Sequence, residues 1–179
     1  MRSAVITAPT GGSAGVMPAI AYALTQSKRK VPMEKIRQGL LAGAAIGYLC
    51  KHNATLSGAE GGCQSEIGVA SSMTAAFIAQ AMDSAPLVIE NAAESALEHH
   101  LGMTCDPVAG YVQVPCIERC AFGAVKAWIA FMIATNEIAS RHRVDLDTTI
   151  KTLAETGRDM SAKYKETSEG GLAANLVLC

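Results

Sequence analysis

The chain has 179 residues, of which 50% are hydrophobic and 4% aromatic, with 15 Lys and Arg against 16 Asp and Glu. Its length is sufficient for one domain with a hydrophobic core, and its balanced charge, without a basic stripe, argues against nucleic acid and anionic membranes as partners. Every long apolar run is interrupted by Gly, Pro or charge before it reaches membrane-spanning length, so we expect no membrane span.

The first third of the chain predicts two helices. A short β-branched run and a Pro/Gly loop occupy residues 1–13, and a helix is expected over about 14–30. A second helix is expected over 33–52, and it carries glycines at four-residue spacing, at Gly39, Gly43 and Gly47. Such a stripe of small residues allows another helix to approach closely.

The rest of the chain predicts four further helices, over residues 63–83, about 86–101, 116 to about 143, and 145–164. Pro86 stands where prolines begin helices, and Asp147 or Thr148 is expected to cap the last helix. Periodicity is lost at Gly170-Gly171. Abundant Ala and Gly with few aromatic residues favour helices over sheets. We therefore predict an all-α fold, with one helical domain over residues 1–179.

The six cysteines are metal ligands or buried apolar residues rather than disulfides. No secretory signal peptide is visible, so we expect a reducing, cytoplasmic location in which disulfides rarely persist. Cys50 has apolar neighbours at helical spacing, which favours a core thiol. Cys120 lies one turn beyond Cys116 and is interpreted as a packing residue.

Three cysteines lie at junctions between loops and helices. Cys63 and Cys116 each begin a predicted helix, where the helix dipole and free N–H groups stabilise a thiolate. Cys105 lies in the loop between them. Each alone can be a small residue at a tight junction. Together they favour a metal site, because ligands at such junctions can converge and their spacing matches no C-x-x-C zinc pattern.

The last residue, Cys179, follows the apolar stretch ANLVL. Two interpretations are open. The tail is a frayed end with an incidental thiol, or it enters the core as a strand-like segment and brings a fourth thiol to the site.

Four segments resemble the α-chain of the iron–sulfur-dependent L-serine dehydratases: TAPTGGSAGVMPA (7–19), NATLSGAEGGCQSEIGVASSM (53–73), EHHLGMTCDPVAGYVQVPCIERC (98–120) and KYKETSEGGLA (163–173). The resemblance covers nearly the whole chain. It implies an L-serine ammonia-lyase, an enzyme of amino-acid catabolism and gluconeogenesis that converts L-serine to pyruvate and ammonia.

The resemblance also implies a site. It assigns Cys63, Cys105 and Cys116 to a 4Fe–4S cluster, with Cys179 as a displaceable fourth ligand. Family segments expected near the substrate contain Thr10, Gly11, Asn53 and Ser57. Two positions depart from the family pattern, because Gly11 and Cys120 each replace an asparagine.

Serine dehydration requires a base for the α-proton and help for a poor leaving group. An iron without a protein ligand can act as a Lewis acid on the serine hydroxyl, while a positioned base removes the proton. The family's Ser-His-Thr motif, expected to supply that base, belongs to its β-domain and is absent here. We therefore expect a chain that lacks the front of the α part and works with a β chain or domain, in an oligomer.

Two alternatives to this enzyme are considered. A pyridoxal-phosphate dehydratase would hold phosphate with TGGSAG at a helix start, but it requires a Schiff-base lysine and a large α/β fold that the sequence does not show. The other alternative is a non-catalytic helical module that binds a partner, or a truncated fragment without a functional cluster.

Overall fold

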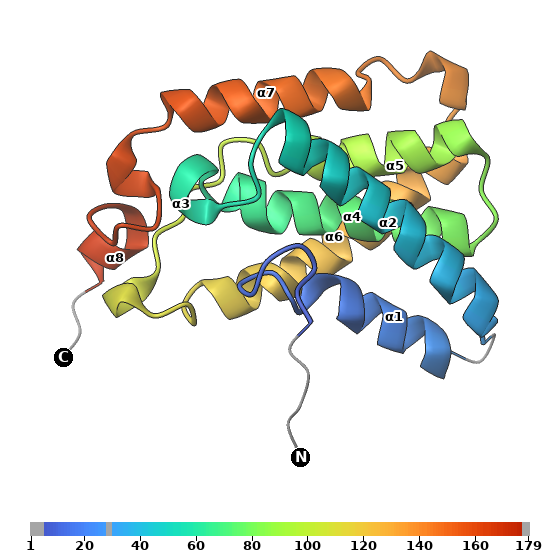
Figure 1. Ribbon diagram of the computed structural model, residues 1–179, viewed down its shortest axis with the longest axis horizontal. Coiled ribbons are helices and arrows are strands. Elements are labelled where there is room, and N and C mark those ends of the chain that lie inside the picture. Colours follow the sequence, from blue (N-terminus) through green and yellow to red (C-terminus); the bar gives the residue numbers. More distant parts are fainter. Residues whose placement is uncertain (1–5, 28–29, 177–179) are drawn as a thin grey trace.

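The computed structural model describes residues 6–27 and 30–176 (Figure 1). Within these residues the regular structure is helical, and β pairing is limited to one isolated bridge, which confirms the all-α prediction. The α-helices are α1 (Val16–Gln26), α2 (Met33–Asn53), α3 (Gly58–Gly61), α4 (Val69–Ala81), α5 (Pro86–Glu98), α6 (Cys116–Asn136), α7 (Leu146–Asp159) and α8 (Gly171–Asn175). Between them lie a π-helical turn, η1 (Gln64–Gly68), and the 3₁₀ turns η2 (Val108–Gly110), η3 (Ala139–Arg141) and η4 (Ala162–Tyr164).

Helix α4 is the centre of the molecule. Helices α1, α2, α5 and α6 pack around it (Figure 1), and nearly all its residues are buried. Its sequence is apolar or small on every side, as expected for a fully enclosed helix. Its buried hydroxyls are satisfied by backbone carbonyls: Ser71 donates to Gly123 (2.8 Å) and Ser72 donates to Ala93 (2.7 Å). The polar residues of α4 therefore join it to α5 and α6.

The predicted glycine stripe on α2 faces α4. A Cβ atom on Gly39 would lie 2.6 Å from the carbonyl oxygen of Phe77, and one on Gly43 would lie 2.8 Å from that of Met73. Real Cβ atoms do not approach backbone oxygens so closely. The predicted close approach of another helix is confirmed.

Several predicted boundaries were wrong. The fifth helix ends at Asn136 rather than near residue 143, because Asn91 on α5 donates hydrogen bonds to the Glu137 side chain and the Ala139 carbonyl (3.1 Å each). The last long helix ends at Asp159 rather than at residue 164. Its cap is Asp145 rather than Asp147 or Thr148, because the Asp145 side chain accepts from Thr148 N (2.7 Å).

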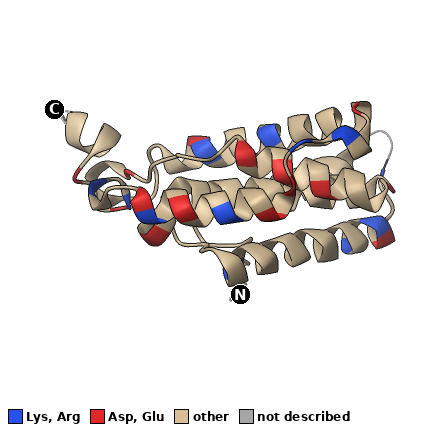
Figure 2. Ribbon diagram, turned by 90° about the horizontal axis from the view of Figure 1, so that it is seen from above, with Lys and Arg blue, Asp and Glu red and all other residues tan. Residues whose placement is uncertain are grey.

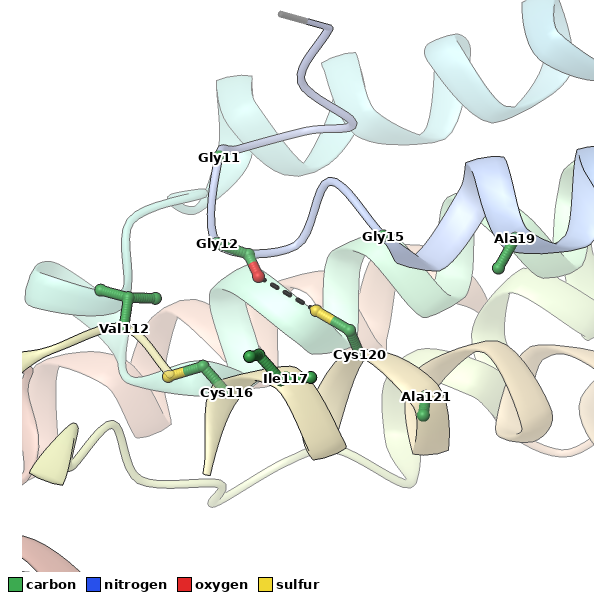
Figure 3. Close-up of a pocket in the computed structure, with 9 residues that line it drawn as sticks. All are labelled: Gly11, Gly12, Gly15, Ala19, Val112, Cys116, Ile117, Cys120 and Ala121. Carbon is green, nitrogen blue, oxygen red and sulfur yellow. Dashed lines mark hydrogen bonds between the residues drawn. The ribbon is translucent and has the colours of Figure 1, made fainter. Parts of the chain in front are cut away.

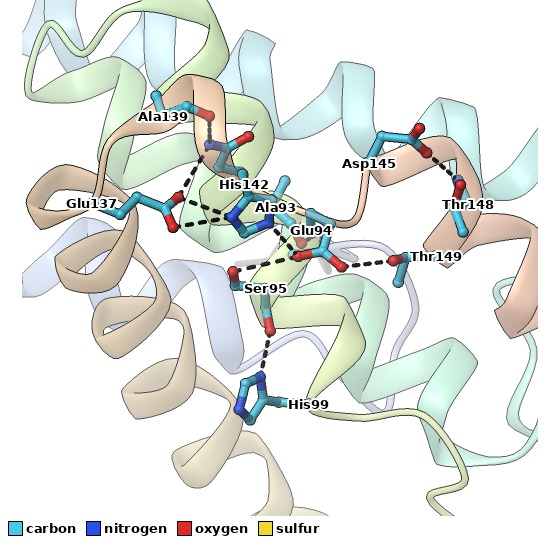
Figure 4. A network of polar contacts seen from close by, with 12 residues as sticks. Ala93, Glu94, Ser95, His99, Glu137, Ala139, His142, Asp145, Thr148 and Thr149 are labelled. Carbon is cyan, nitrogen blue, oxygen red and sulfur yellow. Dashed lines mark hydrogen bonds and ion pairs between the residues drawn. The ribbon is translucent and has the colours of Figure 1, made fainter.

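A buried polar network joins three elements at the end of the molecule where α6 ends (Figure 4). Glu94 on α5 is fully buried, and its carboxylate accepts from Thr149 Oγ1 on α7 (2.7 Å) and contacts His142 Nε2 (2.9 Å). The Nδ1 atom of His142 faces Glu137 (3.0 Å). The Glu94–His142 network therefore fixes the α6–α7 connection against α5.

Basic and acidic residues are interspersed along the helices (Figure 2). Among residues 6–27 and 30–176, no helix is both long and apolar enough to cross a bilayer.

Candidate metal centre

Three potential metal ligands converge at one end of α4. One ligand atom from each of Cys63, Glu66 and Cys105 lies within 4.8 Å of the other two. Cys63 is the residue before η1, Glu66 lies in η1, and Cys105 lies in the loop after α5. Both thiols are 1% exposed. Residues 42 positions apart are therefore brought together inside the protein.

Backbone pairing with the C-terminal segment holds Cys105 in place. Cys105 N donates to Tyr164 O (2.8 Å), and Glu166 N donates to Cys105 O (2.7 Å). On the other side, a Cβ on Gly58 would lie 3.2 Å from Cys105 Sγ, so the α3 loop passes directly over the sulfur. The segments around residues 58 and 165 thus form two walls of the site.

Arg119 on α6 connects the thiols to the surrounding loops. Its Nη1 atom donates to Cys63 Sγ (3.3 Å) and to Thr104 O (2.7 Å), and its Nη2 atom donates to Asp106 Oδ1 (2.9 Å). The Asp106 side chain is 3% exposed. This arrangement places a guanidinium cation between a sulfur and a buried carboxylate.

Asp106 also anchors the beginning of α8. Its Oδ2 atom accepts from Leu172 N (2.5 Å). Gly171 has φ +60°, and a Cβ there would lie 2.3 Å from Oδ2, so only glycine permits this approach. The GG pair near the C-terminus thus docks the final segment onto the loop that carries Cys105.

Of the two thiolates expected at helix starts, the pKa of Cys63 is lowered as expected and that of Cys116 is raised. A hydrogen bond from Cys105 lowers the pKa of Cys63 despite burial, and the charge of Arg119 lowers it further. The same hydrogen bond raises the pKa of Cys105. Burial, reinforced by the charge of Cys63, raises the pKa of Cys116 to about 11. At Cys116, desolvation therefore opposes the thiolate form.

Cys116 is buried at the start of α6 and borders a pocket of about 720 Å³ (Figure 3). The pocket lies between the N-terminal loop, α1 and α6. Its lining residues are Gly11, Gly12, Gly15, Ala19, Val112, Cys116, Ile117, Cys120 and Ala121. Cys120 points to the loop, where its Sγ donates to Gly12 O (3.0 Å), and it packs against the buried cluster of Cys63, Ile67 and Cys105. Its interpretation as a packing residue fits these contacts.

The residues predicted to bind substrate lie in different surroundings. The Thr10 hydroxyl donates to Glu66 Oε1 at the centre, and Gly11 lines the pocket beside Cys116. Asn53 ends α2, donates to Leu49 O (2.9 Å) and lines a separate pocket. Ser57 caps α3, next to Gly58. Cys179 lies outside the described residues.

Glu66 and Asp106 are functional candidates that the sequence did not single out. The spacing C-x-x-E from Cys63 to Glu66 is a possible signal, but the π-helical turn that sets their relative position has no sequence signature. Asp106 was visible only as part of an Asp-Pro pair. Its partners, Arg119 and Leu172, are distant in sequence.

Comparison with known proteins assigns the chain to a family. Residues 1–173 match the family model described as Serine dehydratase alpha chain. The chain belongs to this family. It is 50% identical over 175 residues to the L-serine dehydratase of Streptomyces coelicolor and 52% identical over 175 residues to L-serine dehydratase 2 of Escherichia coli. It is 50% identical over 173 residues to the L-serine dehydratase of Helicobacter pylori strain J99.

These matches cover nearly all of the present chain and a minor part of the relatives. They include 98%, 98% and 96% of the chain, respectively, and 38% of each relative. The chain therefore spans about two fifths of the length of these serine dehydratases. The family resemblance inferred from the sequence motifs is confirmed.

Proposed function

We propose that the chain is the metal-bearing part of an L-serine ammonia-lyase that converts L-serine to pyruvate and ammonia. One observation carries this proposal: in a serine dehydratase alpha chain, Cys63 and Cys105 meet beside the loop that contains Thr10. Cys116 is not a member of this group of converging ligands, but it borders the pocket lined by Gly11 and Gly12 of the same loop. The relatives' names supply the substrate and the reaction class.

The proposed cofactor is a 4Fe–4S cluster held by Cys63, Cys105 and Cys116, with Cys179 as a fourth ligand. The donor set fits such a group, because the three described thiols are buried and Cys63 already accepts an N–H···S bond from Arg119. When bound, the cluster would supply a Lewis-acidic iron for the serine hydroxyl. Arg119 would hold positive charge beside the thiolates and stabilise their ionised form.

The pocket beside Cys116 is the proposed entry for serine. Its volume of about 720 Å³ exceeds what a small amino acid requires. Gly11 lines this pocket, and the neighbouring Thr10 donates to Glu66 of the thiol group, which supports their predicted contact with substrate. Ser57 adjoins the same region through Gly58. Asn53 would contact a substrate only if the end of α2 moved, so its role rests on the resemblance alone.

The base for the α-proton is proposed to come from a β chain or domain with the Ser-His-Thr motif. Helix α6 offers a surface for such a partner, because it is apolar on its outer side as well as its inner side. The exposed apolar residues of this outer face are Ile117, Phe122, Val125, Ile129 and Met132. The predicted oligomer and cytoplasmic location remain predictions.

The proposal is tested by anaerobic reconstitution with iron and sulfide, with and without a co-expressed partner that carries the Ser-His-Thr segment. We expect a broad visible iron–sulfur absorption and pyruvate formation from L-serine by the pair. Cys63→Ser should abolish both signals, whereas Cys50→Ser, which changes a core thiol on α2, should retain them. A colourless wild-type chain after reconstitution would contradict the proposal.

A further inference from the structure

The carboxylate of Glu66 lies beside the predicted cluster cysteines and at the edge of the pocket proposed for serine. One of its oxygens is within 4.8 Å of the sulfurs of Cys63 and Cys105. A Cβ on Gly12, which lines the pocket, would lie 2.7 Å from Glu66 Oε1. The Thr10 hydroxyl donates to the same oxygen. Glu66 is only partly buried, so a small ligand has access to its side chain.

Glu66 forms no ion pair within the described part of the chain. The guanidinium of Arg119 is directed to Cys63 and Asp106 instead. A carboxylate close to thiolates is repelled by their charge, and the repulsion is stronger in a partly desolvated site than in water. A ligand that brings a positive charge to this place is therefore favoured.

A second carboxylate adds to the negative charge. A Cβ on Gly58 would lie 3.3 Å from Glu66 Oε2 and 3.6 Å from Glu166 Oε2, so both side chains face the same point. Glu166 also forms no ion pair among the residues that the structure describes. A cation bound at Glu66 would reduce the repulsion between the two side chains.

L-Serine carries such a positive charge in its α-ammonium group. The proposed function assigns the serine hydroxyl to the metal centre and leaves the ammonium without a partner. The residues predicted to contact substrate are all uncharged: Thr10, Gly11, Asn53 and Ser57. Glu66 can supply the missing partner, because an ionised carboxylate offers more acceptor positions than the single bond from Thr10 uses.

We propose that Glu66 binds the α-ammonium of serine and so makes the site selective for an amino acid over a plain hydroxy acid. The inference rests on the proposed function, because it concerns the same site. A hydrogen bond between two ionised groups is about twice as strong as one between neutral groups. The bond from Thr10 orients the carboxylate, which couples the N-terminal loop to the bound substrate.

The test compares L-serine with 3-hydroxypropanoate, which keeps the hydroxyl and the carboxylate but has hydrogen in place of the ammonium. The anaerobically reconstituted chain is used with its co-expressed partner. The measurements are KM for L-serine, the inhibition constant of 3-hydroxypropanoate and the visible iron–sulfur absorption. The ratio of the two constants is the preference for the ammonium, and we expect it to be at least about 10-fold in the wild type.

Glu66→Gln should raise KM for L-serine by about 10- to 100-fold, because a charged partner is lost. The inhibition constant of 3-hydroxypropanoate should not rise, and the absorption should remain. Calorimetric titration with L-alanine and propanoate repeats the comparison without turnover, since neither ligand has a hydroxyl to lose. Glu66→Gln should weaken the binding of L-alanine and not that of propanoate.

Two further variants distinguish ammonium binding from a structural role. Thr10→Val removes the hydrogen bond to Glu66 but keeps its charge, so the preference should persist even if both constants rise. If Thr10→Val loses the preference as completely as Glu66→Gln, Glu66 acts only by holding the loop, and the inference fails. Thr55 and Glu60 form a second threonine–glutamate pair near α3, and Glu60→Gln should keep both constants.

The outcomes separate this inference from the proposed function. A wild-type protein that is colourless or forms no pyruvate overturns the proposed function and the inference with it. An active wild type without the preference, or an unchanged preference in Glu66→Gln, overturns the inference alone. If Glu66→Gln does not retain the iron–sulfur absorption, Glu66→Asp replaces it. Its carboxylate is withdrawn by one methylene, so the preference should fall, and an unchanged preference overturns the inference.

Discussion

At the scale of single residues, Arg119 determines the charge balance of the thiol site. It is the cation that contacts Cys63 Sγ, and it simultaneously pairs with the buried Asp106. A buried carboxylate left without such a partner typically costs about 3–5 kcal/mol. Arg119 therefore serves both stability and thiolate formation.

Replacement of Arg119 by Gln should raise the pKa of Cys63, because a hydrogen bond and a nearby positive charge that favour the thiolate are lost. The ultraviolet thiolate absorbance of the metal-free chain, measured against pH, reports this change. The titration step of Cys63 is identified by subtraction. The absorbance curve of Cys63→Ser is subtracted from that of the wild type, and the curve of the Cys63→Ser, Arg119→Gln double variant is subtracted from that of Arg119→Gln. Arg37→Gln, on the exposed side of α2, should leave the pKa of Cys63 unchanged. An unchanged pKa of Cys63 in Arg119→Gln would contradict the role of Arg119 in stabilising the thiolate.

At the scale of elements, the packing of α2 on α4 depends on missing side chains. Ala is a better helix former than Gly by about 1 kcal/mol, so Gly39→Ala would stabilise a helix with open space beside it. Here the new Cβ would meet Phe77 O at 2.6 Å. A clash with backbone forces the helices apart.

We therefore expect Gly39→Ala to lower the free energy of unfolding by about 1–3 kcal/mol, the usual range for overpacking. Urea denaturation followed by circular dichroism measures the change. Ala44→Gly, at an exposed position of the same helix, should cost about 1 kcal/mol through propensity alone. A more stable Gly39→Ala protein would show that α2 and α4 are not in such close contact.

The Glu94–His142 network makes the α6–α7 connection dependent on pH. Burial opposes a charge on His142, but the hydrogen bonds with Glu94 and Glu137 outweigh it and raise the pKa of His142. Between the ordinary pKa of about 6.5 and this raised value, the folded protein binds more protons than the unfolded chain. Stability must then fall as pH rises through this interval.

His142→Gln should remove this part of the pH dependence. The measurement is the free energy of unfolding at a series of pH values, compared between variant and wild type. The difference should be largest below the ordinary pKa of histidine and should shrink as pH rises. His52→Gln, at an exposed position on α2, should retain the wild-type profile, and parallel curves for His142→Gln and wild type would refute the role of the network.

At the scale of the whole molecule, the candidate metal centre joins segments from opposite ends of the chain. The N-terminal loop reaches it through Thr10, and the C-terminal segment reaches it through Tyr164 and Glu166. A ligand bound only by the folded state stabilises that state by an amount set by its concentration relative to Kd. Metal binding should therefore stabilise the entire fold.

Co²⁺ at about 100 times its Kd should add about 2.7 kcal/mol, which corresponds to a rise in Tm of about 5–10 °C for a chain of this size. Thermal unfolding of the full chain with and without Co²⁺ tests this expectation. The rise in Tm on addition of Co²⁺ should persist in Cys50→Ser, although a core thiol is altered, and should be lost in Cys105→Ser. An equal increment in Cys105→Ser would place the metal elsewhere.

Local patterns in the sequence were sufficient for the six longer helices, the α2 stripe and the positions of the three junction cysteines, whereas the short helices α3 and α8 were not predicted. Composition, Pro86 and the glycine spacing depend on interactions within one helix or one helix face. The end of α6 could not be found in this way, because its own residues continue to favour a helix. It ends because Asn91, on another element, binds Glu137 and Ala139.

By itself, the sequence determined the helical class, the family and which thiols stand at helix starts, since these follow from short-range periodicity and contiguous motifs. Only the tertiary structure decided that Cys63 and Cys105 meet, that Glu66 lies beside them, and that the hydrogen bond between the two thiols lowers the pKa of Cys63 and raises that of Cys105. The physical reason is distance along the chain. Proximity and burial between remote segments arise from packing around α4, and these set both ligand geometry and pKa.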